Sequence, residues 1–185
     1  MVCLKIIKWL FILAGIIFIL AAAVKYYLIP EILLPTKYSE YVERYADEYN
    51  IDKYLVYSVI RTESGFENEA ISTKSAKGLM QITESTGKWA ADKIGIDDFD
   101  ADDLHDPETN IRIGCWYIAY LLGQFNGELS TSLAAYNAGH SKVREWLENS
   151  SYSSDGITLD TIPYEETLNY VKRVRITLYL YLKVY

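Results

Sequence analysis

Cysteine, histidine and proline are scarce in this sequence, which limits the chemistry that it can carry. Its 185 residues include two Cys, two His and four Pro. His105 and His140 are isolated, and no His-Glu-x-x-His pattern or cysteine pair occurs, so we expect no bound metal. A phosphate-cradling glycine loop and a Gly-x-Ser-x-Gly elbow are also missing. Their absence argues against common nucleotide enzymes and serine hydrolases, and no cofactor is expected.

Excess positive charge and a disulfide framework are lacking too. The net charge is −7, which argues against a nucleic acid partner. Cys3 lies at the N-terminus and Cys115 within an expected helix, so we expect no disulfide between them and interpret Cys115 as a small buried apolar residue. The acidic run from Asp97 to Asp103 has Asp103 where a calcium loop needs Gly and Thr109 where it needs Glu. We interpret this run as a solvated loop.

One long hydrophobic run stands at the N-terminus. Lys5 and Lys8 precede an uncharged stretch from Trp9 to Val24, and Lys25 follows it. A run of this length predicts a single transmembrane anchor, and the lysines before it place the N-terminus in the cytoplasm and the rest of the chain outside the membrane. The small residues at 21–23 leave a cleaved signal peptide, followed by secretion, as the alternative.

The chain is expected to have three parts. Residues 1–29 form the cytoplasmic tip and anchor, residues 30–40 a linker bracketed by Pro30 and Pro35, and residues 41–185 an all-α domain. In that domain apolar residues recur with a period near 3.6 and no alternating strand pattern appears. The helix that follows Asp106 and Pro107 is expected to be central, with Gly114 allowing a neighbouring helix to approach closely. Expected helices cover residues 41–49, 52–64, 83–94, 106–125, 130–138, 143–147 and 164–185.

An ionisable residue, Glu63, continues the apolar stripe formed by Leu55, Val56, Val59 and Ile60 on one expected helix. Burial raises the pKa of a carboxyl group, as a general acid near neutral pH requires. The pattern alone favours a structural glutamate that forms a salt bridge with Arg61 or a distant lysine.

Four short blocks of sequence stand out: Glu63 to Phe66, Gly78 to Ile82, Ala134 to Gly139 and Ile162 to Thr167. Together they resemble the catalytic domain of the soluble-type lytic transglycosylases. They occur in the order of that family, and the resemblance extends from about Tyr41 to Leu180. Four blocks in order are a far more specific signal than one.

The resemblance implies a lysozyme-like helical fold with a groove for a peptidoglycan strand. Glu63 matches the catalytic glutamate of the family, and Tyr136 matches the tyrosine whose hydroxyl orients it. The remaining matched positions are implied to bind or orient the glycan or its peptide stem: Ser64, Met80, Gln81, Asn137 and Glu166. Thr167 and Pro163 are interpreted as a helix start.

The implied reaction cleaves the bond between N-acetylmuramic acid and N-acetylglucosamine and leaves a 1,6-anhydro ring. Glu63 alone would act as acid and then base, with the 2-acetamido group of the substrate replacing the second carboxylate that most glycosidases use. Two alternatives stay open. One is a hydrolytic muramidase of the same fold, with Asp97 or Asp98 as a base, and the other is a non-catalytic wall-binding subunit of a secretion or conjugation apparatus.

Overall fold

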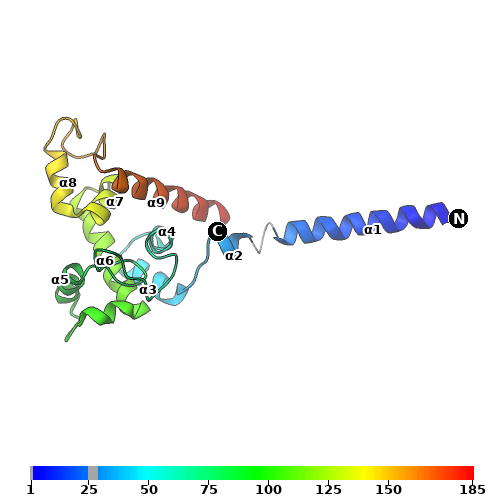
Figure 1. The fold of residues 1–185 in the computed structure, drawn as a ribbon, viewed down its shortest axis with the longest axis horizontal. Helices are drawn as coiled ribbons and strands as arrows, with labels where there is room; N and C mark the ends of the chain where they lie inside the picture. Colours follow the sequence, from blue (N-terminus) through cyan, green and yellow to red (C-terminus); the bar gives the residue numbers. More distant parts are fainter. Residues whose placement is uncertain (1, 25–28) are drawn as a thin grey trace. The chain divides into compact units, whose positions relative to one another are not determined.

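The computed structural model describes the backbone of residues 2–24 and 29–185, and the side chains of residues 9–24 and 31–185. The chain divides into two compact units, with the boundary between Thr36 and Lys37. Each unit is coloured along the sequence in Figure 1.

The N-terminal unit contains α1 (Val2–Ala23) and α2 (Ile29–Leu33). Large apolar side chains of α1, among them Phe11 and Phe18, are exposed. Within the part of the chain that is described, no helix has both the length and the hydropathy that a membrane crossing requires. The expected flanking residues at 25–28, and the side chains of Lys5 and Lys8, lie outside the described residues.

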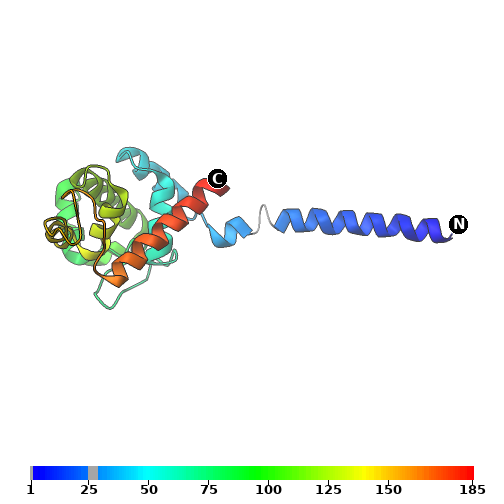
Figure 2. The same ribbon diagram turned by 90° about the horizontal axis from the view of Figure 1, so that it is seen from above.

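The second unit is built from helices and loops, and α9 lies across one face of it (Figures 1 and 2). Its described residues contain no extended strand, and isolated bridges join Ile71 to Lys77 and Lys77 to Ile82. The elements are α3 (Ser39–Glu48), α4 (Lys53–Glu63), α5 (Glu84–Ile94), the 3-10 helix η2 (Ala101–His105), α6 (Pro107–Gln124), α7 (Leu129–Ala138), α8 (His140–Leu147) and α9 (Glu165–Val184).

The helix boundaries follow from capping residues in the sequence. The side chains of Asp52, Thr83 and Asp106 accept hydrogen bonds from backbone N–H groups in the first turns of α4, α5 and α6. Gly95 ends α5 in the left-handed conformation, with φ of 68°. These caps confirm the predicted starts of three helices and one predicted stop.

Helix α6 is central, as predicted, because it packs against α3, α5, α7 and η2. The expectation for Gly114 is wrong in one respect. The close neighbour is the side chain of Met80, since a Cβ atom at Gly114 would lie 2.2 Å from its Sδ atom. The glycine at this position therefore makes room for the buried side chain of Met80 and not for a second helix.

The acidic run also differs from the expected loop. Its last residues are part of η2, which covers residues 101–105, and Asp100 and Asp103 make a reciprocal capping box at the start of η2. Leu104 is fully buried and anchors this segment, so the carboxylates are exposed while the backbone is ordered. The sequence interpretation of solvated carboxylates holds, but short-range caps and one apolar anchor give the segment a helical turn.

Candidate active site

Glu63 is the last residue of α4, and its carboxyl group is partly buried. Burial raises its pKa to about 7, because the loss of water disfavours the ionised form. Arg173 opposes this shift and Glu166 adds to it. A carboxyl group with this pKa is about half protonated at neutral pH and can both donate and accept a proton.

The structural alternative for Glu63, a salt bridge with Arg61 or a lysine, does not form. None of the salt bridges among the described side chains includes Glu63. The carboxyl group therefore keeps its raised pKa and is available to a ligand. An unpaired, partly buried acid of this kind is costly to stability, and such groups are concentrated at functional sites.

Two parallel tyrosine rings, Tyr136 and Tyr170, are electrostatically coupled to Glu63. Their centroids are 6.4 Å apart and their planes differ by 6°. Burial and the nearby Glu63 raise the pKa of both phenols well above the usual value, so both remain neutral. Neutral phenols can exchange hydrogen bonds with either protonation state of the acid.

The two hydroxyl groups differ in their partners. The Tyr136 hydroxyl donates to the backbone oxygen of Met80 at 2.8 Å, so its oxygen can still accept a hydrogen bond from a protonated acid. The Tyr170 hydroxyl is buried, and no described residue lies in normal hydrogen-bond geometry with it. It nevertheless favours the ionised form of Glu63 and lowers its pKa. Catalytic hydrogen bonds are often long before a ligand binds.

A buried asparagine holds the loop that carries Met80 and Gln81. Asn110 on α6 accepts from Met80 N at 2.8 Å, and its amide donates to the backbone oxygens of Lys77 and Leu104 at 3.0 and 2.8 Å. Gly78 packs against these hydrogen-bonded groups, because a Cβ atom there would lie 2.1 Å from the oxygen of Leu104. Two of these hydrogen bonds fix the loop to the central helix, and the third fixes η2 to the same side chain.

Two side-chain amides line the same cavity, one with a free hydrogen-bond acceptor and the other with a free donor. Gln81 donates from Nε2 to the oxygens of Ala70 and Gly78, which leaves Oε1 as an acceptor. Asn137 accepts at Oδ1 from the hydroxyl of Thr167 at 2.8 Å, which leaves its NH₂ group as a donor. The cavity therefore offers one acceptor and one donor beside the carboxyl group, an arrangement suited to a ligand amide or hydroxyl.

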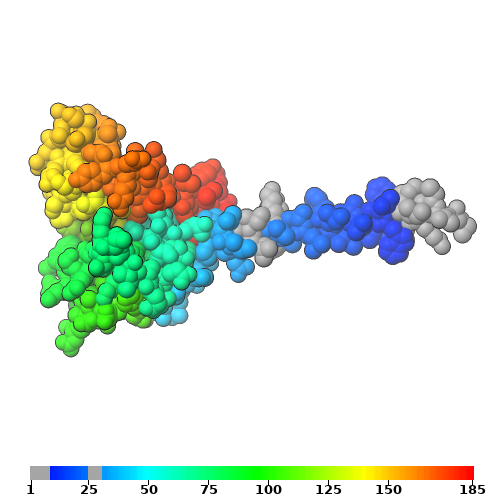
Figure 3. Space-filling view, viewed as in Figure 1, coloured from blue at the N-terminus to red at the C-terminus, as the bar shows by residue number. Residues whose placement is uncertain are grey.

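These groups line one cavity of about 190 Å³ together with charged residues at its rim. Lys74 and Glu166 form an exposed ion pair of 3.6 Å between the loop at 72–76 and the start of α9. In the space-filling view the green segment near residue 75 and the orange start of α9 face each other (Figure 3). The lining residues are Glu63, Ser72, Thr73, Lys74, Ala76, Gln81, Thr83, Tyr136, Asn137 and Glu166.

Two predicted site residues are not in this lining. The Ser64 hydroxyl donates to the oxygen of Ile60 and accepts from Phe66 N, and so satisfies the backbone at the end of α4. Met80 has no exposed surface and packs beneath the site. Contact of Ser64 with a sugar stays a prediction, whereas Met80 is in a position to orient the site from the core.

Sequence reasoning missed several residues at or beside the site, among them Lys74, Tyr170 and Thr167. Lys74 was not marked by any block, and Tyr170 lies in an ordinary helical stripe. Thr167 was interpreted as part of a helix start, but its buried hydroxyl holds Asn137. A signal for Thr167 and Tyr170 was present in their spacing, because they share one face of α9 with Glu166.

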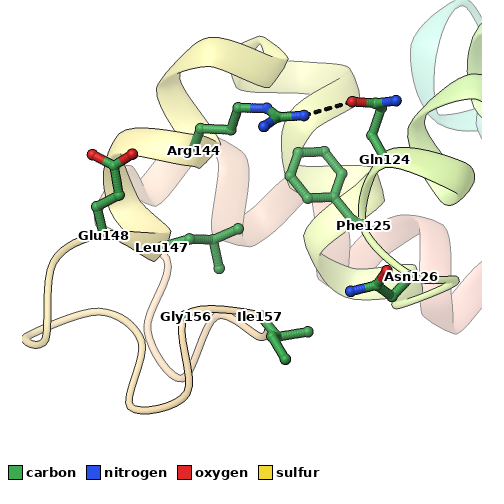
Figure 4. A pocket seen from close by; sticks show the side chains of 8 residues that line it. All are labelled: Gln124, Phe125, Asn126, Arg144, Leu147, Glu148, Gly156 and Ile157. Carbon is green, nitrogen blue, oxygen red and sulfur yellow. Dashed lines mark hydrogen bonds between the residues drawn. The ribbon is translucent and has the colours of Figure 1, made fainter.

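A larger cavity, of about 320 Å³, lies away from the predicted residues (Figure 4). It is enclosed by the end of α6, by α8 and by the loop at 156–157. The guanidinium group of Arg144 is already held by Gln124, 2.5 Å away. No residue of the four sequence blocks lines it, so cavity size alone does not identify the site.

Comparison with known proteins agrees with the sequence blocks. The family described as Transglycosylase SLT domain matches residues 40–157. Over 142 residues, 76% of the chain, the sequence is 37% identical to a soluble lytic murein transglycosylase of Escherichia coli. Over 123 residues, 58% of the chain, it is 31% identical to the membrane-bound lytic murein transglycosylase C of Edwardsiella ictaluri.

Solved structures of similar fold carry related descriptions. An inactive glutamate-to-glutamine mutant of the lytic transglycosylase Slt from Pseudomonas aeruginosa covers 82% of the chain at 32% identity, with a TM-score of 0.74. A complex of the 70-kDa soluble lytic transglycosylase with bulgecin A covers 81% at 33% identity, with a TM-score of 0.71. The chain spans 22% to 32% of the length of these four proteins.

Proposed function

Because the chain belongs to the Transglycosylase SLT domain family, we propose that it is a peptidoglycan lytic transglycosylase with Glu63 as its catalytic acid and base. One observation carries the proposal. The cavity combines a single unpaired carboxyl group, whose pKa is raised to about 7, with two amides able to hold an N-acetyl sugar. Soluble and membrane-bound relatives that bear lytic murein transglycosylase names support the substrate class.

In the first step, protonated Glu63 donates its proton to the oxygen between N-acetylmuramic acid and N-acetylglucosamine. The bond from that oxygen to C1 breaks, and the acetamido carbonyl of the substrate stabilises the positive charge at C1. The Gln81 acceptor and the Asn137 donor are the groups that would hold the sugar in this geometry. The cavity itself supplies one partly buried carboxyl group, which fits substrate assistance better than a two-carboxylate mechanism.

In the second step, the carboxylate of Glu63 removes the proton from the C6 hydroxyl of the muramyl residue. The C6 oxygen attacks C1 and closes the 1,6-anhydro ring, and Glu63 is again protonated. An intramolecular nucleophile has a high effective concentration, so the site needs only to orient the ring and to exclude water. The raised pKa of Glu63 serves both steps, because neither protonation state is strongly favoured near neutral pH.

The products test the proposal directly. Purified peptidoglycan digested with the enzyme should release muropeptides that end in 1,6-anhydro-N-acetylmuramic acid, which mass spectrometry separates from reducing ends by the mass of one water. Reducing ends would identify a muramidase and would require a base for water. Asp97 and Asp98 are exposed in the loop after α5 and do not line the cavity, so the structure offers little support for that alternative.

The pH profile should follow the titration of Glu63. We expect kcat/KM to be high below about pH 7 and to fall above it, because the first step needs the protonated acid. Tyr170→Phe removes a group that lowers the pKa of Glu63, so the alkaline limb should move to higher pH. The distant Tyr179→Phe variant should leave the limb in place. If kcat/KM of Tyr170→Phe fell at the same pH as that of the wild type, coupling between the phenol and the acid would be contradicted.

We also propose that the N-terminal segment attaches the chain to the membrane with the catalytic domain outside the cytoplasm. Support comes from the uncharged, exposed apolar side chains from Trp9 to Val24. After alkaline extraction of cells, the chain should remain in the membrane fraction. Leu13→Arg combined with Ile16→Arg should release it, whereas Ile157→Arg in a surface loop should not. Release of the unaltered chain at its full mass would exclude attachment, and release of a shortened chain would indicate a cleaved signal.

A further inference from the structure

The side of α9 that faces away from the core is both basic and apolar. Lys172, Ile176, Tyr179 and Lys183 are spaced by three or four residues, and Arg175 lies beside them on the same side of the helix. All five side chains are exposed, whereas the buried residues of α9 lie on its opposite side. Figure 2 shows α9 along one face of the domain. We call these five residues the outer face of α9.

The outer face is positively charged although the chain as a whole is acidic. The net charge is −7, yet residues 167–185 contain four basic residues and no acidic residue. Three of the four belong to the outer face. Among the side chains that the structure describes, no salt bridge includes Lys172, Arg175 or Lys183. The charge of this face is therefore available to an anionic partner.

Apolar and aromatic surface lies among these cations. Ile176 and Tyr179 are each 60% exposed. The ammonium group of Lys183 lies 5.6 Å from the centroid of the Tyr179 ring, and the guanidinium group of Arg175 donates to the hydroxyl of Ser130 at 3.0 Å. These contacts hold the cations at the surface without neutralising them. A hollow of about 360 Å³ on this face is lined by Lys172, Arg175, Ile176 and Tyr179.

The combination of charge and apolar surface matches a lipid bilayer with anionic headgroups. Phosphate groups pair with the cations, while the isoleucine and the tyrosine enter the boundary between headgroups and acyl chains. The same face of a second copy fits poorly, because two basic surfaces repel each other. A soluble polyanion would match the charges but would leave the apolar side chains in water.

We propose that the outer face of α9 docks the domain on the surface of an anionic lipid bilayer. Lys172, Arg175 and Lys183 extend toward the phosphates, and Ile176 and Tyr179 enter the interface. None of these residues lines the catalytic cavity, so docking leaves the cavity open to a ligand. The inference goes beyond the proposed function, and it differs from attachment through the N-terminal segment because it requires anionic lipid.

Lysine acetylation of the full chain on lipid vesicles tests the contact. The chain is mixed with an excess of vesicles of phosphatidylcholine, either alone or with about one third phosphatidylglycerol, and acetylation is followed by mass spectrometry. Lys172 and Lys183 should react about three- to tenfold more slowly on anionic than on neutral vesicles, and added salt should reverse this protection. The exposed Lys88 on α5 should react equally on both. An apolar N-terminal anchor would bind both lipids, so the comparison isolates the outer face.

A matched pair of variants separates the outer face from a general effect of charge. Ile176→Glu places a carboxylate among the cations and removes apolar surface, so Lys172 and Lys183 should react on anionic vesicles as fast as on neutral ones. Ile157→Glu makes the same change at an exposed isoleucine of the loop before α9 and should keep the protection. Neither isoleucine lines the catalytic cavity, so both variants should release muropeptides from purified peptidoglycan at the wild-type rate.

The outcomes separate this inference from the proposed function. Equal acetylation of Lys172 and Lys183 on the two kinds of vesicle would overturn the inference, as would equal slowing of Lys88. Protection that rises with protein concentration in the absence of lipid would identify self-association and would also overturn it. These results leave the proposed function intact, because the release of anhydro products is measured without lipid. Protection on anionic vesicles in a chain that cleaves no peptidoglycan would support the outer face and contradict only the proposed function.

Discussion

Glu63→Gln should lower turnover on peptidoglycan by about a thousandfold or more while preserving binding of the glycan. Glutamine keeps the size of the side chain and much of its hydrogen bonding. It can neither protonate the glycosidic oxygen nor take the proton from the C6 hydroxyl, so both steps fail together. The measurement is the release of soluble muropeptides, with sedimentation of enzyme with insoluble peptidoglycan as the binding assay.

A matched control separates the loss of a proton donor from the loss of structure. Glu145→Gln changes an exposed carboxylate on α8 that does not line this cavity, and it should retain most of the turnover. A Glu63→Gln protein that still cleaves at the wild-type rate would remove Glu63 from the mechanism. If both the wild type and this variant bind peptidoglycan but cleave none, the non-catalytic wall-binding alternative is favoured.

The same variant tests the raised pKa through stability. In the folded protein burial raises the pKa of Glu63 to about 7 from its usual value of 4.5, so its contribution to stability is fully present below about pH 4.5 and is lost as pH rises to 7. Each pKa unit corresponds to about 1.4 kcal/mol, which gives a loss on the order of 3 kcal/mol. Glu63→Gln does not titrate. Its stability relative to wild type should therefore increase between pH 4 and pH 8, as measured by chemical unfolding at each pH.

Helix positions could be predicted from the sequence because local rules determine them. Asp52, Thr83, Asp106 and Gly95 are caps whose chemistry acts within one turn, and the structure has helices that start or stop at each. The place of Glu63 on an apolar stripe likewise indicated a perturbed carboxyl group. These inferences needed no knowledge of contacts between distant segments.

Contacts between distant segments account for what the sequence did not reveal. Lys74 reaches the site only because its loop faces the start of α9, and Tyr170 only because α9 lies beside the end of α4. The close approach at Gly114 was assigned to a neighbouring helix. The sequence shows that the residue at this position is small, but it does not show which group packs against it. Ser64 matches a motif position of the family, yet its hydroxyl bonds to backbone groups at the end of α4 and does not line the cavity.

Asn110→Ala should destabilise the domain by about 2–4 kcal/mol, because three buried hydrogen bonds lose their partner at once. The substitution leaves Met80 N and the oxygens of Lys77 and Leu104 without the amide that bridges them. Asn110→Asp should be at least as damaging, since the carboxylate can still accept from Met80 N but can no longer donate to either oxygen. Asn169→Ala, at an exposed position of α9, is the control and should not lower stability, because alanine is favoured in a helix.

The effect on activity should exceed the effect on folding alone. Met80 and Gln81 follow Gly78 on the loop that Asn110 attaches to α6. A loosened loop therefore displaces the acceptor that Gln81 presents to the cavity and the backbone oxygen that holds the Tyr136 hydroxyl. Well below its melting temperature, Asn110→Ala should therefore show both a raised KM and a lowered kcat. Normal kinetics in a destabilised variant would mean that the hydrogen bonds of Asn110 maintain the fold without positioning the site. An unchanged free energy of unfolding would show that the loop is held by other contacts, with Gly78 and Met80 packed against α6 as the remaining candidates.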